Sequence, residues 1–177
     1  MQAKPILLAL LAVTVAAIGG VVVAEKTSHY TASDQVNAAA PVQTQQSIRI
    51  NAAPEKVWAL LTNVNHWADW QKDISHPRLS GAFQAGNSFD WESGGLNIHS
   101  TVGVAEPLKR IVWSGPAFGS FAIHTWTLTE HDGTTEVVVR ESMEGWLVSL
   151  ATPVFQKGLD TSIATWLGAL KQSAERS

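Results

Sequence analysis

The stretch HTWTLTEHDGTTEVVVRES, residues 124–142, has the sequence pattern of a β-hairpin. Asp132 and Gly133 lie at its centre, and this dipeptide favours a type I′ turn, because both central positions of that turn have a positive φ. Counting outward from the turn predicts three facing pairs on one side of the hairpin: Leu128 with Val137, Trp126 with Val139, and His124 with Glu141. Side chains alternate along a strand, so this largely apolar set is expected to face the core.

His124 and Glu141 form the pair farthest from the turn on this face. Directly opposed Cβ atoms lie about 4.5–5.5 Å apart, so the imidazole and the carboxylate are expected to meet. Three roles are open to the pair. It satisfies two polar groups within an apolar face, it anchors a ligand hydroxyl or carboxylate through His124, or it performs acid–base catalysis in which Glu141 orients His124.

The composition describes one globular domain and an additional apolar segment. The chain has 177 residues, of which 45% are hydrophobic and 15% are charged, and its net charge of -3 excludes a strongly basic nucleic-acid-binding protein. It contains no cysteine, which excludes disulfides, a thiolate nucleophile and cysteine-based metal sites. Eight Trp residues against one Tyr suit a wide apolar interior.

The apolar segment lies at the N-terminus, in residues 1–24. The run from Pro5 to Ala24 contains no charged residue, and about 20 helical residues span a bilayer core of roughly 30 Å. Its length favours an uncleaved transmembrane anchor, while the small residues near Ala24 also fit a cleaved signal peptide. Either alternative predicts that the following domain is exported to the cell envelope, with Lys4 on the cytoplasmic side.

A polar, alanine-rich segment without periodicity follows, and it predicts a flexible linker over residues 25–46. Residues 47–177 then form the predicted folded domain. A short strand at 47–51 precedes a helix that begins at Pro54, and a second short helix or turn carries Trp67 and Trp70.

Antiparallel strands are predicted from residue 86 to the hairpin of residues 124–142, with a loop at SGPAFG, residues 114–119. Gly94 and Gly95 form a tight turn, and counting outward from it gives three further pairs: Trp91 with Ile98, Phe89 with Ser100, and, on the outer face, Asp90 with His99. This succession of strands places the domain in the α+β class.

A long C-terminal helix ends the chain. Thr152 is its predicted N-cap and Pro153 its first residue. Apolar residues then recur at helical spacing: Phe155, Leu159, Ile163, Trp166, Leu167, Leu170 and Ala174. This helix is the one long enough to cover the apolar face of the sheet, and a gap between the two is expected to bind a small apolar ligand.

Three segments resemble the START-like, or SRPBCC, superfamily and its polyketide cyclase/dehydrase-like proteins. They are IRINAAPEKVWALLTNVNHWADW at 48–70, GNSFDWESGGLNIHSTVGVAEPLKRIVW at 86–113 and HTWTLTEHDGTTEVVVRESMEG at 124–145. The resemblance implies a helix-grip fold, in which a curved antiparallel sheet wraps around a long C-terminal helix. One departure is Trp67-Ala68-Asp69-Trp70, where the family often has proline after the first tryptophan.

The residues predicted to line the cavity are Phe89, Trp91, Ile98, Ser100, Trp113, His124, Trp126, Glu141 and Met143. The tryptophans offer a stacking surface, and Met143 adapts its shape to a ligand. No histidine is placed to activate Ser100 as a nucleophile. His66, His76 and His99 suggest no three-ligand metal geometry, so no metal and no cofactor are expected.

The sequence therefore predicts a domain that binds a hydrophobic small molecule or lipid, tethered to a membrane through residues 5–24. The alternative is a cyclase/dehydratase-type enzyme that uses His124 and Glu141 as a catalytic pair. A third hypothesis is a protein-interaction role in the cell envelope, with a vestigial cavity. No nucleic-acid partner is expected, and the sequence leaves the oligomeric state open.

Overall fold

A computed structural model of the chain describes residues 20–176, and its contacts divide the chain into two units, one up to Tyr30 and one from Thr31. In the first unit, residues 20–27 are helical. Most of the predicted anchor or signal peptide, residues 1–19, lies outside the described part. Within residues 20–176, no helix is long and apolar enough to cross a membrane.

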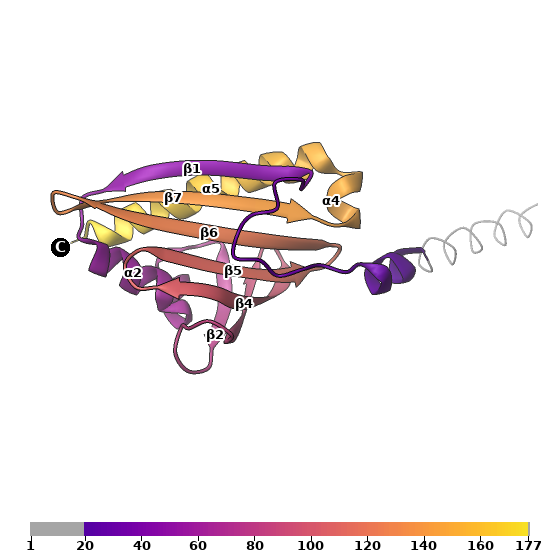
Figure 1. The fold of residues 1–177 in the computed structure, drawn as a ribbon, viewed down its shortest axis with the longest axis horizontal. Helices are drawn as coiled ribbons and strands as arrows, with labels where there is room; N and C mark the ends of the chain where they lie inside the picture. The colour runs from indigo at the N-terminus through magenta and orange to yellow at the C-terminus, as the bar shows by residue number, and fades with distance from the viewer. Residues whose placement is uncertain (1–19, 177) are drawn as a thin grey trace, which may run out of the picture. The chain divides into compact units, whose positions relative to one another are not determined.

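The second unit is an α+β domain, as predicted. Its elements are β1 Val42–Ile50, α2 Pro54–Thr62, η1 Val64–His66, α3 Trp67–Trp70, β2 Ile74–Leu79, β3 Ser88–Ser93, β4 Leu96–Glu106, β5 Arg110–Ala117, β6 Ser120–His131, β7 Thr134–Glu144, α4 Trp146–Leu150 and α5 Thr152–Ala174. The strands form one antiparallel sheet of seven strands in the order β1-β7-β6-β5-β4-β3-β2. The long helix α5 runs along one face of this sheet (Figure 1).

The strand pairing in both hairpins confirms the register that was predicted by counting outward from their turns. Asp132 and Gly133 have φ values of 48° and 77°, as a type I′ turn requires, and His124 faces Glu141 across the β6–β7 ladder. The β3–β4 hairpin likewise pairs Trp91 with Ile98. Since strand side chains alternate, these two turns determine which residues of four strands face α5.

The predicted linker of residues 25–46 differs from the structure in its second half. Strand β1 begins at Val42, so residues 42–46 belong to the sheet. Within the second unit, the residues between Thr31 and β1 cross the outer face of β5–β7 (Figure 1). There the backbone N–H of Asn37 donates to Ser142 Oγ at 3.0 Å, its side chain donates to Glu144, and Arg110 donates to the carbonyl of Asp34.

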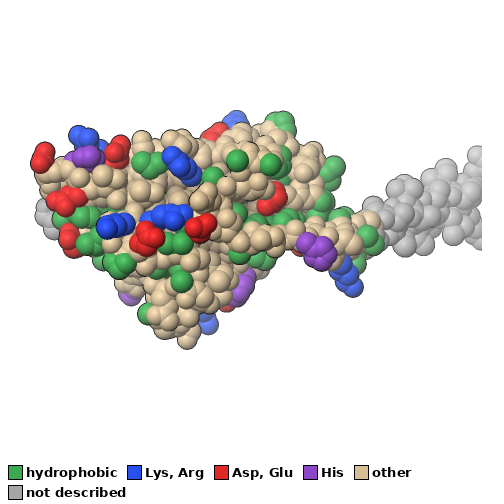
Figure 2. All heavy atoms as spheres, in the orientation of Figure 1, with side chains coloured by type: hydrophobic (Ala, Val, Ile, Leu, Met, Phe, Trp, Pro, Cys, Tyr) green, Lys and Arg blue, Asp and Glu red, His purple; other side chains and the backbone are tan. Residues whose placement is uncertain are grey.

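Charged side chains of both signs lie close together on this outer face (Figure 2). A nucleic-acid-binding surface instead gathers lysine and arginine into one basic patch. The arrangement on the displayed face therefore agrees with the small net charge of -3.

Two local predictions were wrong, and one strand was missed. The SGPAFG segment is not a loop, because β5 continues to Ala117 before the turn. Strand β2 was not predicted, since Pro77 and a register shift between Ser75 and Arg78 interrupt its alternation. Thr152 does not cap α5: its hydroxyl donates to the carbonyl of Val148 at 3.0 Å, and Ala151 occupies the N-cap position.

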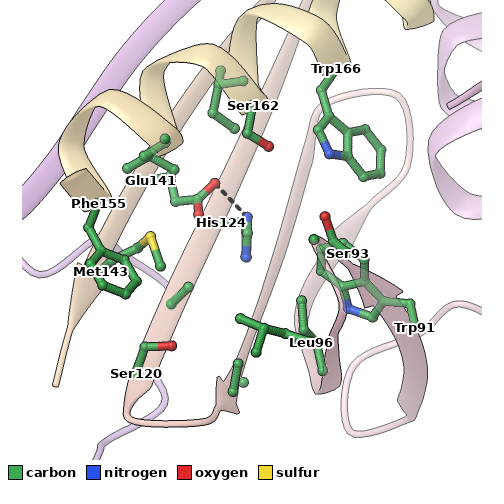
Figure 3. Close-up of a pocket in the computed structure, with 18 of the residues that line it drawn as sticks. Trp91, Ser93, Leu96, Ser120, His124, Glu141, Met143, Phe155, Ser162 and Trp166 are labelled. Atoms are coloured by element: carbon green, nitrogen blue, oxygen red, sulfur yellow. Dashed lines mark ion pairs between the residues drawn. The ribbon is translucent and has the colours of Figure 1, made fainter. Parts of the chain in front are cut away.

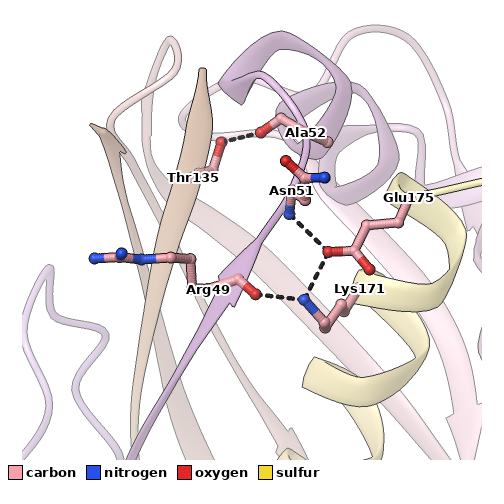
Figure 4. Close-up of polar contacts among 6 residues, drawn as sticks. All are labelled: Arg49, Asn51, Ala52, Thr135, Lys171 and Glu175. Carbon is pink, nitrogen blue, oxygen red and sulfur yellow. Dashed lines mark hydrogen bonds and ion pairs between the residues drawn. The ribbon is translucent and has the colours of Figure 1, made fainter. Parts of the chain in front are cut away.

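The C-terminal end of α5 is attached to the end of β1 by charged hydrogen bonds (Figure 4). Lys171 Nζ donates to the carbonyl of Arg49 at 2.7 Å and to Glu175 Oε1 at 2.6 Å. The same carboxylate oxygen accepts the backbone N–H of Asn51 at 2.7 Å. Lys171 and Asn51 lower the pKa of Glu175 from its ordinary value, the lysine more strongly, against a smaller opposing effect of burial.

A second group of hydrogen bonds joins the N-terminal half of α5 to β1. Gln156 Nε2 donates to the carbonyl of Gln43 at 2.9 Å, and Thr44 donates to Asp160 Oδ1 at 2.7 Å. The side-chain amide of Gln46 also reaches the carbonyl of Asp160, at 2.8 Å. These contacts hold α5 against the β1 edge, so any opening between helix and sheet lies toward β3 and β4.

A cluster of tryptophans fills the inner part of the space between sheet and helix. Trp166 of α5 makes edge contacts with Trp67 and Trp70, at centroid distances of 5.2 and 5.5 Å, and with Trp126 at 5.8 Å. Trp166 is 4% exposed and Trp67 is fully buried. Burying rings of this size contributes much of the apolar stabilisation of a domain. The open space that remains is displaced toward the N-terminal half of α5.

Candidate functional site: a cavity between the sheet and helix α5

A cavity of about 370 Å³ lies between the sheet and the N-terminal half of α5. Of the residues predicted to line it, all but two do so: Trp91, Ile98, Trp113, His124, Trp126, Glu141 and Met143. The hairpin registers of β3–β4 and β6–β7 bring these side chains to one face. A volume of this size falls at the lower end of the range for small-molecule sites.

Phe89 and Ser100 were predicted to line the cavity but lie in the packed core. Phe89 is 1% exposed and makes an edge contact with Trp67 at a centroid distance of 5.3 Å. Ser100, also 1% exposed, accepts a hydrogen bond from Trp91 Nε1 at 3.0 Å. Its hydroxyl therefore holds a cavity wall in position.

His124 and Glu141 meet as predicted, inside an otherwise uncharged cavity wall. Nδ1 of His124 lies 2.7 Å from Oε2 of Glu141, and the two side chains are 12% and 5% exposed. Oε2 nevertheless has no donor in good hydrogen-bond alignment among the described residues. The two groups therefore lie in close contact without an aligned hydrogen bond.

Aromatic rings hold the imidazole of His124 on two sides. Trp113 stacks on it, with centroids 5.2 Å apart and an interplanar angle of 24°, and Trp91 presents an edge at 6.3 Å. Nδ1 is directed at Glu141, while Nε2 points the other way, into the cavity (Figure 3). The protein thus presents one defined ring nitrogen to a molecule inside the cavity.

Two further polar groups belong to the same wall. The indole nitrogens of Trp113 and Trp126 are buried and have no hydrogen-bond acceptor among residues 20–176. A buried N–H without an acceptor costs about 1–3 kcal/mol. Both rings line the cavity, but their N–H groups are buried behind its surface and are not exposed to it.

Prediction from sequence missed the small residues and the helical side of the cavity. The lining residues that it did not name are Ser93, Gly94, Leu96, Gly115, Ala117, Ser120, Ala122, Val154, Phe155, Gly158, Leu159, Ser162, Ile163 and Trp166. Phe155, Leu159, Ile163 and Trp166 belong to the predicted apolar stripe, so the stripe itself was the available signal. The glycines, serines and alanines carry no such signal, because their contribution is the space that they leave open.

No group of three or more histidine and acidic side chains within residues 20–176 is arranged to hold a metal ion. The cavity wall itself contributes only one imidazole and one carboxylate. The described wall is therefore mostly apolar, with a few serines and one pair of ionisable side chains.

Several solved structures share this fold. A hypothetical protein from Helicobacter pylori, jhp0584, has a TM-score of 0.69 at 19% identity, over 83% of this chain and 100% of that one. The Zhui aromatase/cyclase from Streptomyces sp. R1128 has a TM-score of 0.67 at 15% identity, over 76% and 93% of the two chains. A START superfamily protein from Mycobacterium smegmatis has a TM-score of 0.66 at 11% identity, over 75% and 97%.

Identities this low establish the shared fold alone. No curated protein shows significant sequence similarity to the chain. The sequence does match one protein family over residues 41–175, which takes in the entire sheet and nearly all of α5. The cavity, the helix-grip arrangement and this match lead to one conclusion: the chain belongs to the polyketide cyclase/dehydrase and lipid transport family.

Proposed function

We propose that this protein binds a hydrophobic small molecule or lipid in the cavity between the sheet and α5. The observation that carries the proposal is a cavity of about 370 Å³ in which His124 and Glu141 are the only ionisable residues of the wall. Apolar walls with a few convergent polar groups are typical of small-molecule sites. The family's association with lipid transport supports the same function.

The wall also indicates the chemistry of the bound molecule. Its apolar body packs against the aromatic side chains, and an oxygen of the ligand lies near Nε2 of His124. An imidazole nitrogen donates to or accepts from a hydroxyl according to its protonation, so a hydroxyl or carbonyl suits this position.

The proposal is tested by extracting whatever accompanies the purified full-length protein. The protein is denatured in organic solvent, and the released small molecules are identified by mass spectrometry. Ala122 lines the cavity on β6, so Ala122→Phe fills space there and serves as the comparison. A stoichiometric apolar compound from the wild type and none from Ala122→Phe supports binding. Equal amounts of the same compound from both proteins contradict it.

A second function is favoured by the arrangement of His124. Glu141 engages Nδ1 and leaves Nε2 toward the cavity, which is the geometry of an oriented general base. In a cyclase or dehydratase, Nε2 takes a proton from a carbon beside a carbonyl, and an enolate forms. The enolate carbon then bonds to a second carbonyl carbon of the substrate, whose oxygen takes the proton back from the imidazolium, or the enolate expels a β-hydroxyl group, which leaves as water with that proton. The aromatase/cyclase among the proteins of similar fold makes this alternative worth testing.

Proton exchange tests the catalytic alternative without knowledge of the substrate. Benzoylacetone in D₂O exchanges the protons between its two carbonyls, and NMR follows the rate. A base at His124 accelerates exchange, and His124→Ala removes the acceleration while Thr127→Ala, on the outer face of β6, retains it. Identical rates with wild type and His124→Ala contradict general-base catalysis.

The proposal extends to location: the domain is exported and stays tethered through its N-terminal segment. Its support is the uncharged run from Pro5 to Ala24 and the single lysine, Lys4, before it. N-terminal sequencing of the mature protein, together with membrane fractionation, tests it. An intact N-terminus in the membrane fraction supports a tether, cleavage near Ala24 supports a secreted form, and an intact protein in the cytosolic fraction contradicts export.

A further inference from the structure

A groove lies beside the cavity and shares part of its wall. It has a volume of about 690 Å³, and its wall adds two threonines and two charged side chains to the shared residues. The side chains of Thr161 and Thr165 line it, together with the oppositely charged Lys157 and Asp73. A largely apolar cavity and a groove that carries one charge of each sign therefore lie next to each other.

Five residues line both compartments: Ser93, Gly94, Val154, Gly158 and Ser162. Four of them have no side chain or a single hydroxymethyl group, so little material separates the two spaces. In Figure 3, the hydroxyl of Ser162 points from α5 into the cavity region, and the hydroxyl of Ser93 points toward the helix from the sheet side. These five residues lie on α5 and at the β3–β4 turn, and we call the space between them the passage.

The fold does not explain why position 158, in this passage, is occupied by glycine. It lies within α5, where glycine is about 1 kcal/mol less favourable than alanine. A Cβ at this position would meet no atom within 4 Å, so neither packing nor backbone conformation calls for glycine. Gly168, in the same helix, also has open space around it but lines neither compartment. A side chain at position 158, unlike one at 168, would occupy the passage.

Lys157 and Asp73 give the groove one positive and one negative charge. Neither side chain has an ion-pair or hydrogen-bond partner among the described residues, and no ion pair joins the two. The other side chains that line the groove are uncharged. A ligand group that carries both charges complements this pair. A group with a single charge is attracted by one member of the pair and repelled by the other.

From these observations we infer that the ligand is an elongated amphipathic molecule which occupies both compartments. This inference rests on the proposed binding function. The apolar body lies in the cavity, the chain passes Gly158, and a zwitterionic end lies in the groove between Lys157 and Asp73. Gly158 is then a specificity-determining residue, because its missing side chain decides whether a long ligand fits.

Two probes of different length test the inference by calorimetric titration of the full-length protein. 2-Naphthol is short enough to stay in the cavity, whereas dodecylphosphocholine, used below micelle-forming concentrations, has a long apolar chain and a zwitterionic end. Gly158→Leu is expected to weaken dodecylphosphocholine binding at least tenfold more than it weakens 2-naphthol binding, because Gly158 lines both the cavity and the groove. Gly168→Leu, the matched control for helix propensity, is expected to change neither affinity.

The charges are tested with the same probes. Lys157→Ala and Asp73→Ala are each expected to weaken dodecylphosphocholine binding about three- to tenfold without effect on 2-naphthol binding. Lys109 lines neither compartment, so Lys109→Ala is the control and is expected to change neither affinity. Unchanged dodecylphosphocholine affinity in Gly158→Leu overturns the passage. Dodecanoate or dodecyltrimethylammonium binding as tightly as the zwitterion overturns the assignment of the polar end. If 2-naphthol fails to bind the wild type, the proposed binding function fails first.

Discussion

Nδ1 of His124 and Oε2 of Glu141 lie 2.7 Å apart on adjacent strands, in a cavity wall whose other residues are uncharged. Taking two such groups out of water is costly, and their attraction offsets that cost only when both are present. The effect of the pair on the free energy of unfolding and its effect on ligand affinity can therefore be measured separately.

Single substitutions of this pair are expected to destabilise the fold more than the double substitution. His124→Leu leaves a buried carboxylate without its partner, and Glu141→Leu leaves a buried imidazole alone, so each is expected to cost about 3 kcal/mol. The double Leu variant is expected to lie within about 1 kcal/mol of wild type, since an apolar pair of similar volume replaces a buried ion pair at little cost. Urea denaturation with a constant m-value measures all three.

The same double variant separates stability from function. It is expected to fold and yet to lose affinity for ligands with an oxygen near Nε2 of His124. If it binds such a ligand as tightly as wild type, the pair is structural only, and both the anchoring and the catalytic roles are contradicted.

Trp166→Ala is expected to destabilise the domain by about 3–5 kcal/mol, the usual range when a buried tryptophan is truncated in a core. Trp166 contacts Trp67, Trp70 and Trp126, so its removal opens the filled inner part of the space toward the cavity. Thermal or urea unfolding measures the loss. Leu150→Ala, at a side chain that is 78% exposed, is the control and should change stability by less than about 0.5 kcal/mol. A small loss in Trp166→Ala would mean that this cluster does not support the fold.

Gly115→Ala is expected to cost about 3 kcal/mol or more, because a Cβ there would overlap the backbone carbonyl of His99 on the neighbouring strand. That carbonyl belongs to the β4 backbone, so it cannot move aside as a flexible side chain would. Gly168→Ala makes the same chemical change at an open helical position and is expected to stabilise the domain by about 0.5–1 kcal/mol. Similar stabilities for the two variants would contradict the close approach of β4 and β5 at Gly115.

Glu175 predicts a pH dependence of stability. Its pKa is lowered from the ordinary value of 4.5, first by the hydrogen bond from Lys171 and then by that from the N–H of Asn51. A group whose pKa is lower in the folded state contributes stability that is present above its unfolded pKa and is lost as the pH falls through its folded pKa. Wild type is therefore expected to be more stable than Glu175→Gln at pH 7, and the difference should shrink below pH 4.5. A difference that does not change with pH would contradict this role of the carboxylate.

Local signals in the sequence predicted the hairpins and much of the cavity wall. The Asp132-Gly133 and Gly94-Gly95 turns each determine a register over short range, and the strand period of two then places every side chain on one face or the other. The position of His124 opposite Glu141 follows from the first of these turns. The apolar stripe of α5 follows in the same way from its helical period.

Other features depend on contacts between segments distant in the sequence. The chain around Asn37 reads as a polar linker, yet it is held by Ser142 and Glu144, which lie 105 and 107 positions away. Strand β2 was missed because His76, with a φ of 51°, and Pro77 interrupt its pattern. The size of the cavity depends on how far Trp166 fills the space between sheet and helix. Helical periodicity predicts that this side chain is buried, but it does not predict the distance between the helix and the sheet.

The central claim is that the space between the sheet and the N-terminal half of α5 is a binding cavity. Calorimetric titration of full-length protein with 2-naphthol tests it most directly, with Ala122→Phe to fill the cavity and Thr127→Phe on the outer face of the same strand as the control. We predict saturable one-to-one binding of 2-naphthol to wild type and to Thr127→Phe. In a folded Ala122→Phe protein, the affinity should be at least tenfold weaker. No binding by the wild type, or equal binding by all three proteins, would contradict it.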